Sequence, residues 1–495
     1  MNGNISVERK TSKSLKWTFL GEITAKLISP ITNMILARLL LPEAFGIVAT
    51  ISIVISLSEL LADSGFSKAI IQKDYDDEID FSKSANTAFW ATFIVAIVFF
   101  LVIAVFKDSI SSLVGSPGYG IPLLVAAIQI PIFSLSSINL AVLKRNFEFK
   151  KIFWLRFASA IIPLIVATTM ASLGFSFWSL IISGLASTAI QAILVIVFSK
   201  WKPKFSFSYL HFKKMLSFSA LNLVEAFLVW LTSSITVFVI THFFDASLTG
   251  MYKLSVTTVN SLLNIVTAVF TPVLFSSLSR LKDDESSFKT MFSKFQKMIS
   301  LALYPLGVGI FLYRDLATKI FFGDGWQQIV LVVGVYTLIS AFIIPINHLA
   351  SIVYFSKKKP IFSIISQIVY GSAILIISLV TPKYGFDYFV IARGIVTLTL
   401  AVTSLIFLNC FFGISIKSTA INLLPAVIGS LFVFGVGFIL RDLLVGLWWD
   451  IIVISICVIV YFSILFLLFK KDVLTLIDFL FKKKRSPEKT DNYVE

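Results

Sequence analysis

The stretch SANTAFWATFIVAIVFFLVIAVF, residues 84–106, carries no charged side chain and is almost entirely apolar. A helix of about 20 apolar residues is long enough to cross the hydrocarbon core of a bilayer. Comparable stretches recur along the whole chain, and we predict about 14 membrane-spanning helices from them. The predicted spans are 15–37, 44–64, 84–106, 120–142, 153–173, 176–198, 216–241, 248–275, 295–313, 326–355, 361–381, 385–411, 419–440 and 447–469. The chain is therefore predicted to be an all-α polytopic membrane protein.

The composition supports a membrane protein. Hydrophobic residues make up 57% of the 495 residues and charged residues 14%, whereas a soluble chain has about 25% charged residues. The net charge is +15. The basic residues lie in short gaps between apolar stretches and form no continuous basic face, so we exclude nucleic acid as a partner. The two cysteines lie in apolar stretches and the three histidines are scattered, which predicts neither a disulfide nor a metal site.

The basic residues alternate between the connectors. Of the 42 Lys and Arg residues, 33 fall in every second connector and seven, among them Arg38 and Lys253, in the others, while Lys26 and Arg393 are assigned to the spans. Cytoplasmic loops of membrane proteins carry the excess of basic residues. We therefore predict that both termini lie in the cytoplasm and that the number of spans is even.

The longest polar connector, residues 199–214, divides the chain near its middle. Ile31-Thr32 matches Ile235-Thr236 at an offset of 204, and Gly46 and Gly250 stand at the same offset. A parallel repeat of six helices is an architecture of alternating-access transporters. The predicted parts are an N-lobe of six helices with its linker (1–214), a C-lobe of six helices (215–415), two further helices (416–470) and a basic cytoplasmic tail (471–495).

Polar residues inside the spans are the candidates for the functional site, because polar and charged groups are costly in lipid and usually face an interior cavity. Several recur at helical spacing, which predicts polar stripes around a hydrated cavity. The candidate substrate or cavity-lining residues within the spans are Glu22, Lys26, Asn33, Asn222, Glu225, Asn260, Asn264, Asn347 and Arg393.

Each candidate also has a structural interpretation, which the sequence leaves open. Glu22 and Lys26 stand four residues apart and can form an ion pair within one helix. Arg393 can reach the membrane interface. The Asn, Ser and Thr stripes can join helices. Glu59 and Asp63 lie near the cytoplasmic end of their span and can reach the headgroups.

No catalytic set is visible, and we predict that the protein is not an enzyme. The chain has no Gly-rich phosphate-binding loop with the Lys-Ser/Thr pair, so ATP is not predicted to drive it. We predict no cofactor. Coupling to a proton or sodium gradient through a carboxylate such as Glu22 or Glu225 stays open.

The segment ILARLLLPEAFGIVATISIVISLSELLADSGFSKAIIQ (35–72) resembles the opening of the polysaccharide transporters in the multidrug/oligosaccharidyl-lipid/polysaccharide exporter superfamily. The resemblance continues at LKRNFEF (143–149) and near Gly250, and it covers essentially the whole chain in length and span count. The chain most resembles the Wzx-type flippases, especially the colanic-acid and teichuronic-acid exporter group.

This resemblance implies two six-helix lobes around a cavity and a place in the bacterial cytoplasmic membrane. It implies that an undecaprenyl-diphosphate-linked oligosaccharide, a precursor of O-antigen, exopolysaccharide or capsule, is flipped to the outer leaflet. Related flippases place cationic residues in the cavity for the diphosphate, and Arg38 lies within the matching motif, which makes it a further candidate. The implied partners are this lipid-linked substrate, membrane lipids, and a polysaccharide polymerase with its assembly proteins.

Two alternatives stand beside the flippase. A cation-coupled multidrug exporter of the same superfamily would share the fold, but the 35–72 motif and the lack of a strong N-lobe carboxylate cluster favour the flippase. A non-transporting membrane scaffold for polysaccharide assembly would not require polar stripes on many helices.

Overall fold

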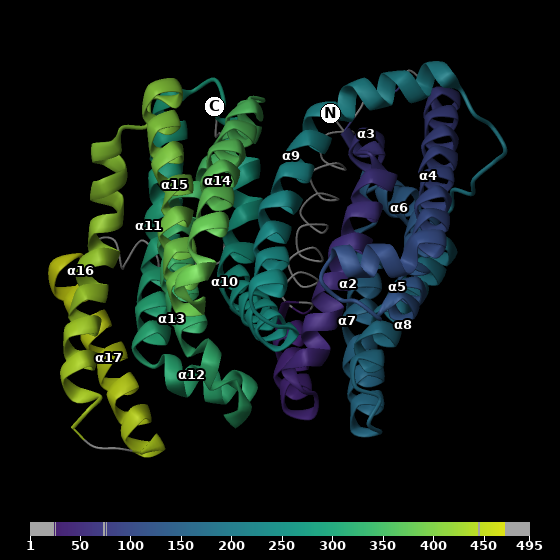
Figure 1. Cartoon of the computed structure of the whole chain (residues 1–495). Helices are drawn as coiled ribbons and strands as arrows, with labels where there is room; N and C mark the ends of the chain where they lie inside the picture. Colours follow the sequence, from purple (N-terminus) through teal and green to yellow (C-terminus); the bar gives the residue numbers. More distant parts are fainter. Residues whose placement is uncertain (1–23, 25, 73–74, 76, 444–445, 471–495) are drawn as a thin grey trace, which may run out of the picture.

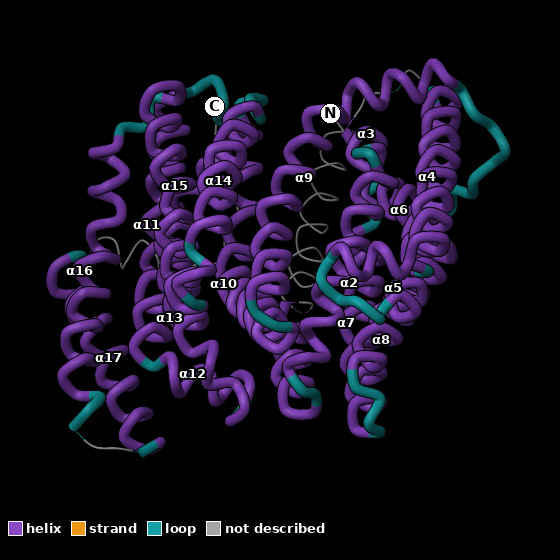
Figure 2. Tube along the Cα trace, viewed as in Figure 1, coloured by secondary structure: helices purple, strands orange, loops and turns teal. Residues whose placement is uncertain are grey.

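The computed structural model describes residues 24, 26–72, 75, 77–443 and 446–470. Over these residues the chain folds into helices and short connectors, with no strand (Figure 2). The all-α prediction is therefore confirmed for the described part of the chain.

The first described helix covers residues 26–39, and the others follow in a simple up-and-down order. They are α2 (Pro42–Asp63), α3 (Phe66–Gln72), α4 (Glu78–Leu113), α5 (Gly120–Ala127), α6 (Gln129–Arg145), α7 (Phe149–Ser172), α8 (Phe177–Phe198), α9 (Tyr209–Phe243), α10 (Ala246–Arg280), α11 (Glu285–Leu312), α12 (Arg314–Phe322), η1 (Asp324–Ile329), α13 (Val330–Ser356), α14 (Ile361–Val380), η2 (Pro382–Tyr384), α15 (Phe386–Phe412), α16 (Ile416–Leu440) and α17 (Leu447–Leu468).

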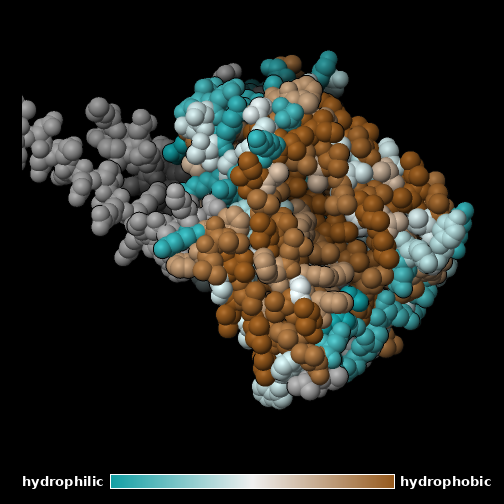
Figure 3. Space-filling view, turned by 90° about the vertical axis from the view of Figure 1, so that its left-hand side faces the viewer, coloured by the Kyte–Doolittle hydropathy of each residue, from teal (hydrophilic) through white to brown (hydrophobic). Residues whose placement is uncertain are grey.

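Twelve helices in the described residues are long and apolar enough to cross a membrane, or thirteen if the bent helix α10 is counted as one span. Every predicted span from 44–64 to 447–469 overlaps one of these helices in chain order. The first predicted span, 15–37, lies mostly outside the described residues. Large apolar side chains cover the face shown in Figure 3, and hydrophilic residues gather toward its two ends, which is the surface of a protein embedded in lipid.

The helices gather into two groups, for which we keep the names N-lobe (residues 26–39 and α2–α8) and C-lobe (α9–α15) (Figure 1). The connectors 199–208, 281–284 and 357–360 lie on one side of the molecule, which we call the basic face because 199–208 and 357–360 each contain three lysines. Apart from α9, the helices of the two lobes stand farther apart toward the basic face. The lobes meet near the other side of the molecule, which carries α12 and which we call the opposite face (Figure 1).

The two lobes repeat the same order of helices. α2 and α10 begin 204 residues apart, at Pro42 and Ala246. α4 and α11 begin 207 apart, and the pairs α7/α14 and α8/α15 begin 212 and 209 apart. Because these offsets are similar, the repeat indicated by the short sequence matches includes whole helices. The helices α16 and α17 follow the repeat and pack on α11, where Tyr461 donates to the carbonyl of Leu301 over 2.7 Å.

Local side chains set where several helices begin. Asp77, Asp245 and Asp284 each accept a hydrogen bond from the backbone nitrogen three residues later, at the first turns of α4, α10 and α11. Such N-caps satisfy helix donors that otherwise have no partner. Asp284 lies in a connector of the basic face, and hydrogen bonds from Ser287 hold the pKa of its carboxyl below the usual value.

Helix α9 is shared between the two lobes. Its first turns pack on the N-lobe, because Met215 is buried beside Phe66 and the Ser219 hydroxyl donates to the carbonyl of Gly65 over 2.9 Å. Farther along, Val239 and Ile240 lie in a core that includes residues of α10 and α13. The predicted division at residues 214 and 215 thus falls inside a helix that packs on both lobes.

Candidate functional site

The lobes are in closest contact where α2 crosses α10. A Cβ atom added to Gly46 would lie 1.8 Å from the carbonyl oxygen of Ala246, and one added to Gly250 would lie 2.0 Å from that of Pro42. Two backbones approach this closely only where side chains are missing. Beside the crossing, the indole of Trp326 donates to the carbonyl of Ala37 over 3.1 Å. These contacts close the space between the lobes at the opposite face.

Arg38 lies at the same closed end. Its guanidinium donates to the carbonyls of Ile320 (2.6 Å) and Lys319 (3.5 Å) in the last turn of α12, and to that of Met34 (2.7 Å). The last carbonyls of a helix have no partner within the helix and carry partial negative charge, which a cation complements. In this structure Arg38 therefore joins the helix of residues 26–39 to α12.

A polar seam runs away from the crossing, between the helix of residues 26–39 and α10. The amide of Asn33 donates to the Thr258 hydroxyl over 3.3 Å, and the ammonium of Lys26 contacts the carbonyl of Asn264 over 3.4 Å. Asn33 and Lys26 are about two turns apart and share one face of their helix. Asn264 is exposed. Three of the predicted cavity residues thus lie along one interface between the lobes.

Lys253 lies on the same helix as this seam, so the prediction that it belongs to a connector is wrong. It follows the start of α10 by seven residues, is partly exposed, and forms no ion pair with any described residue. The spacing of Lys253, Thr257, Asn260 and Asn264 places all four on one face of α10. The predicted span 248–275 already contained Lys253, which was the signal available in the sequence.

Asn260 connects this face to the interior of the C-lobe. The hydroxyl of Tyr336 in α13 donates to its side-chain oxygen over 3.1 Å. This contact fixes the orientation of the amide, so that its nitrogen remains available to donate.

A second polar site is a cavity of about 420 Å³ bounded by α2, α3, α6 and α9. Its charged lining residues are Glu59, Asp63, Lys68 and Lys144, and Asn222 lines it from α9. Asp63 accepts hydrogen bonds from Ser67 and Ser137 over 2.5 and 2.8 Å, and Lys68 donates to Asn222 over 3.4 Å. Glu59 and Asp63, for which the sequence suggested contact with headgroups, line a cavity between helices.

The remaining candidates lie within the C-lobe. Glu225 accepts a 2.6 Å hydrogen bond from Ser363 of α14, and Asn347 accepts one of 3.0 Å from Ser404 of α15. Arg393 is buried, and its Nε donates to Thr236 over 3.1 Å. Each of these three residues joins neighbouring C-lobe helices, and none of these hydrogen bonds reaches the N-lobe. Glu22, and with it the predicted pair with Lys26, lies outside the described residues.

The described residues hold no group of three or more His, Cys, Asp and Glu side chains that could bind a metal ion. What they do place together is a polar seam, a charged cavity and a glycine crossing at the boundary of two lobes. An α-helical membrane protein of this construction, with repeated lobes and polar groups between them, belongs to the class of multi-pass transporters. The sequence matches the family described as "Polysaccharide biosynthesis protein" over residues 35–331, and the chain belongs to this family.

Curated relatives carry related descriptions. The chain is 22% identical over 341 residues to the "Succinoglycan biosynthesis transport protein ExoT" of Rhizobium meliloti, covering 69% of this chain and 68% of the relative. It is 20% identical to the "Lipopolysaccharide biosynthesis protein WzxC" of Escherichia coli, covering 66% of each chain. The "Teichuronic acid biosynthesis protein TuaB" of Bacillus subtilis is also 20% identical, over 70% of this chain and 71% of the relative.

Solved structures share the fold. "Lipid II flippase MurJ, inward closed conformation" superposes with a TM-score of 0.71 at 17% identity, over 95% of this chain and all of that one. An inward-facing multidrug resistance transporter of the MATE family superposes with a TM-score of 0.58 at 13% identity, over 82% of this chain and 95% of that one. At these identities the likeness establishes the fold.

Proposed function

We propose that this protein is a flippase that moves an undecaprenyl-diphosphate-linked oligosaccharide, a precursor of a surface polysaccharide, across the bacterial cytoplasmic membrane. The observation that carries the proposal is the polar seam at the lobe boundary, where Lys26 and Asn33 contact α10. The family and the descriptions of the relatives supply the substrate class.

A seam of this kind addresses the energetic problem of the reaction. Moving a charged or sugar headgroup through hydrocarbon costs many kcal/mol unless polar groups replace its water. Lys26 and Lys253 place positive charge on the two sides of the boundary, which suits a diphosphate. The amides and hydroxyls of the seam suit sugar hydroxyls, while the polyprenyl tail remains in lipid.

The proposed transport mechanism is alternating access. The crossing of α2 with α10 closes the opposite face, and the lobes diverge toward the basic face (Figure 1). Rocking of two repeated lobes about a central site would exchange the closed and open ends. In this proposal the basic face is cytoplasmic, as the distribution of Lys and Arg predicts.

Coupling and partners belong to the same proposal. The carboxylates of Glu59, Asp63 and Glu225 lie in membrane helices and are the candidates for binding a proton or a sodium ion. On the outer side, a polysaccharide polymerase and its assembly proteins would receive the flipped substrate. Neither ion binding nor transfer of the substrate to these partners requires this chain to form or break a covalent bond.

The test is a flipping assay in proteoliposomes, with a fluorescent undecaprenyl-diphosphate oligosaccharide and a membrane-impermeant quencher. The protein should expose substrate from the inner leaflet far faster than empty liposomes do. Lys253→Gln should slow this about tenfold, because a charge-assisted contact contributes ~1.5–3 kcal/mol. Lys289→Gln is the matched control, since this lysine pairs with Glu285 on the basic face. Flipping no faster than in empty liposomes, together with gradient-driven uptake of a cationic dye, would establish the multidrug exporter instead.

A further inference from the structure

The linker between the lobes, residues 199–214, is fastened to the N-lobe helix α4. The backbone nitrogens of Lys204 and Ser208 donate to the side chains of Asn86 (2.9 Å) and Thr87 (3.0 Å). The indole of Trp90 donates to the carbonyl of Lys204 over 2.9 Å. Because three α4 side chains bind its backbone, this extended part of the linker has a fixed path along the helix.

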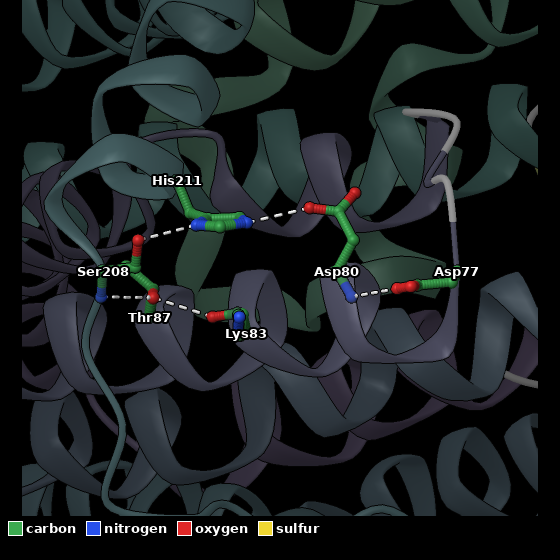
Figure 4. Close-up of polar contacts among 6 residues, drawn as sticks. All are labelled: Asp77, Asp80, Lys83, Thr87, Ser208 and His211. Carbon is green, nitrogen blue, oxygen red and sulfur yellow. Dashed lines mark hydrogen bonds and ion pairs between the residues drawn. The ribbon is translucent and has the colours of Figure 1, made fainter.

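The far end of the linker is fixed as well. One ring nitrogen of His211 lies 2.8 Å from the carboxylate of Asp80, and the other lies 2.7 Å from the hydroxyl of Ser208 (Figure 4). Asp77, beside Asp80, caps the first turn of α4. The carboxylates of Asp80 and Asp77 are thus engaged by the histidine and by the helix terminus.

Aromatic side chains of the fixed linker point outward. Phe205 stacks on Trp90 with the ring centres 4.3 Å apart, yet it is 92% exposed. Phe207 and Tyr209 are also exposed, at 55% and 70%. Aromatic residues with one apolar and one polar surface concentrate at the boundary between the hydrocarbon and the headgroups.

The position of Phe205 relative to α4 indicates how deep this side chain lies in the membrane. Trp90 begins a stripe of α4 that continues at helical spacing through Ile94, Val98 and Leu101, each more than half exposed. This stripe faces lipid, because α4 is a membrane-spanning helix. Phe205 therefore stands at the end of a lipid-facing surface, which is the level of the headgroups.

Positive charge surrounds these aromatic residues. The linker contains five lysines and no Asp or Glu. Four of them, Lys200, Lys204, Lys213 and Lys214, are exposed and form no ion pair with any described residue, while Lys202 donates to the carbonyl of Ile196. The surface combines unneutralised ammonium groups with interfacial aromatic side chains.

We infer that the linker is a binding site for anionic phospholipid headgroups. The lysines would bind the phosphate groups of lipids such as phosphatidylglycerol, and Phe205 and Phe207 would insert beside them. Continuity with the lipid-facing stripe of α4 favours lipid over an acidic protein, which would not need that continuity. Since the linker is fixed to α4, the bound lipids would hold the N-lobe while the C-lobe moves.

The test is native mass spectrometry of the full-length protein, purified with equal amounts of phosphatidylglycerol and phosphatidylcholine. The wild type should retain several-fold more phosphatidylglycerol. The variant Lys200→Gln/Lys204→Gln/Lys213→Gln/Lys214→Gln should lose most of this preference. The control replaces four exposed lysines in other parts of the basic face, Lys282, Lys358, Lys359 and Lys417, and should keep it.

A second variant separates the aromatic contribution. Phe205→Ala/Phe207→Ala leaves the charge unchanged and should reduce retention of both lipids. Equal retention of the two lipids by the wild type would overturn the inference, as would an equal loss of preference in the control. Unchanged lipid retention in the linker variant, with loss of an acidic protein partner in pull-downs, would also overturn it.

Discussion

Gly46 and Gly250, 204 residues apart in the chain, lie against each other where α2 crosses α10: a Cβ atom on Gly250 would stand 2.5 Å from the backbone nitrogen of Gly46. These positions correspond in the repeat, since each is the fifth residue of its helix. Equivalent residues meet where a repeat axis passes between them. The contact therefore marks the axis of the two lobes and the point at which the opposite face is closed.

Replacing either glycine by alanine should separate the lobes at this face. The added Cβ would overlap backbone atoms, which cannot move aside as a flexible side chain can. Overpacking typically destabilises a protein by about 1–3 kcal/mol. Here it would destabilise the conformation in which the lobes are closed at the opposite face. We expect Gly46→Ala and Gly250→Ala to lower the thermal stability in detergent and to increase labelling of an engineered cysteine near the crossing.

The matched controls are Gly309→Ala in α11 and Gly435→Ala in α16, where nothing lies within 4 Å of the added Cβ. Both should have a stability equal to or above that of the wild type, because alanine favours a helix. If the crossing variants were as stable and as unreactive as these controls, the glycines would not determine closure.

The distribution of basic residues makes a prediction about orientation. Ser206 lies in an exposed part of the linker at the basic face, and Gln327 is exposed near α12 at the opposite face. With Cys410 replaced by serine, an impermeant maleimide should label Gln327→Cys but not Ser206→Cys in intact cells. Permeabilised cells should allow both reactions. Labelling of position 206 from outside would show that the protein has the opposite orientation to the one predicted.

Hydropathy predicted the helices well because each span is a local property of about 20 residues. The matching positions of two glycines and a dipeptide predicted the repeat, but they did not predict that the two glycines are in contact. The count of basic residues assigned Lys253 to a connector, although the predicted span 248–275 contains it.

The partners of the candidate residues could not be predicted, since they are distant in sequence. Ser363, which binds Glu225, is 138 residues away, and the α12 carbonyls that bind Arg38 are more than 280 away. Helical periodicity predicts which face of a helix carries a residue. The residue that it contacts depends on how the helices and lobes pack together.

Glu225 allows charge to be separated from hydrogen bonding. Its carboxylate accepts from Ser363, and a glutamine at this position would still offer an oxygen to that hydroxyl. We expect Glu225→Gln to insert normally but to lose most of the flipping activity, since a carboxylate in a membrane helix is retained for function. Ser363→Ala, which removes the donor and keeps the charge, should have the smaller effect. Full activity of Glu225→Gln would show that the charge of Glu225 is not needed for flipping and that this residue has only a structural role.

Arg393 should affect transport through Tyr336 and not through contact with the substrate. Its guanidinium lies 5.6 Å from the ring centres of both Tyr252 and Tyr336, inside the C-lobe, and Tyr336 in turn binds Asn260 of α10. A cation over a ring face restrains the ring. Loss of Arg393 would thus release the hydroxyl that orients the Asn260 amide.

A double-mutant cycle tests this chain of contacts. Arg393→Gln and Tyr336→Phe should each raise the apparent KM for the lipid-linked substrate, and the double variant should be little worse than either, giving a coupling of about 0.5–3 kcal/mol. Tyr252→Phe is the control, because the buried Tyr252 hydroxyl has no hydrogen-bond partner among the described residues and the ring remains. Additive effects of Arg393→Gln and Tyr336→Phe would show that the arginine acts independently of Tyr336, as a residue in direct contact with the substrate would.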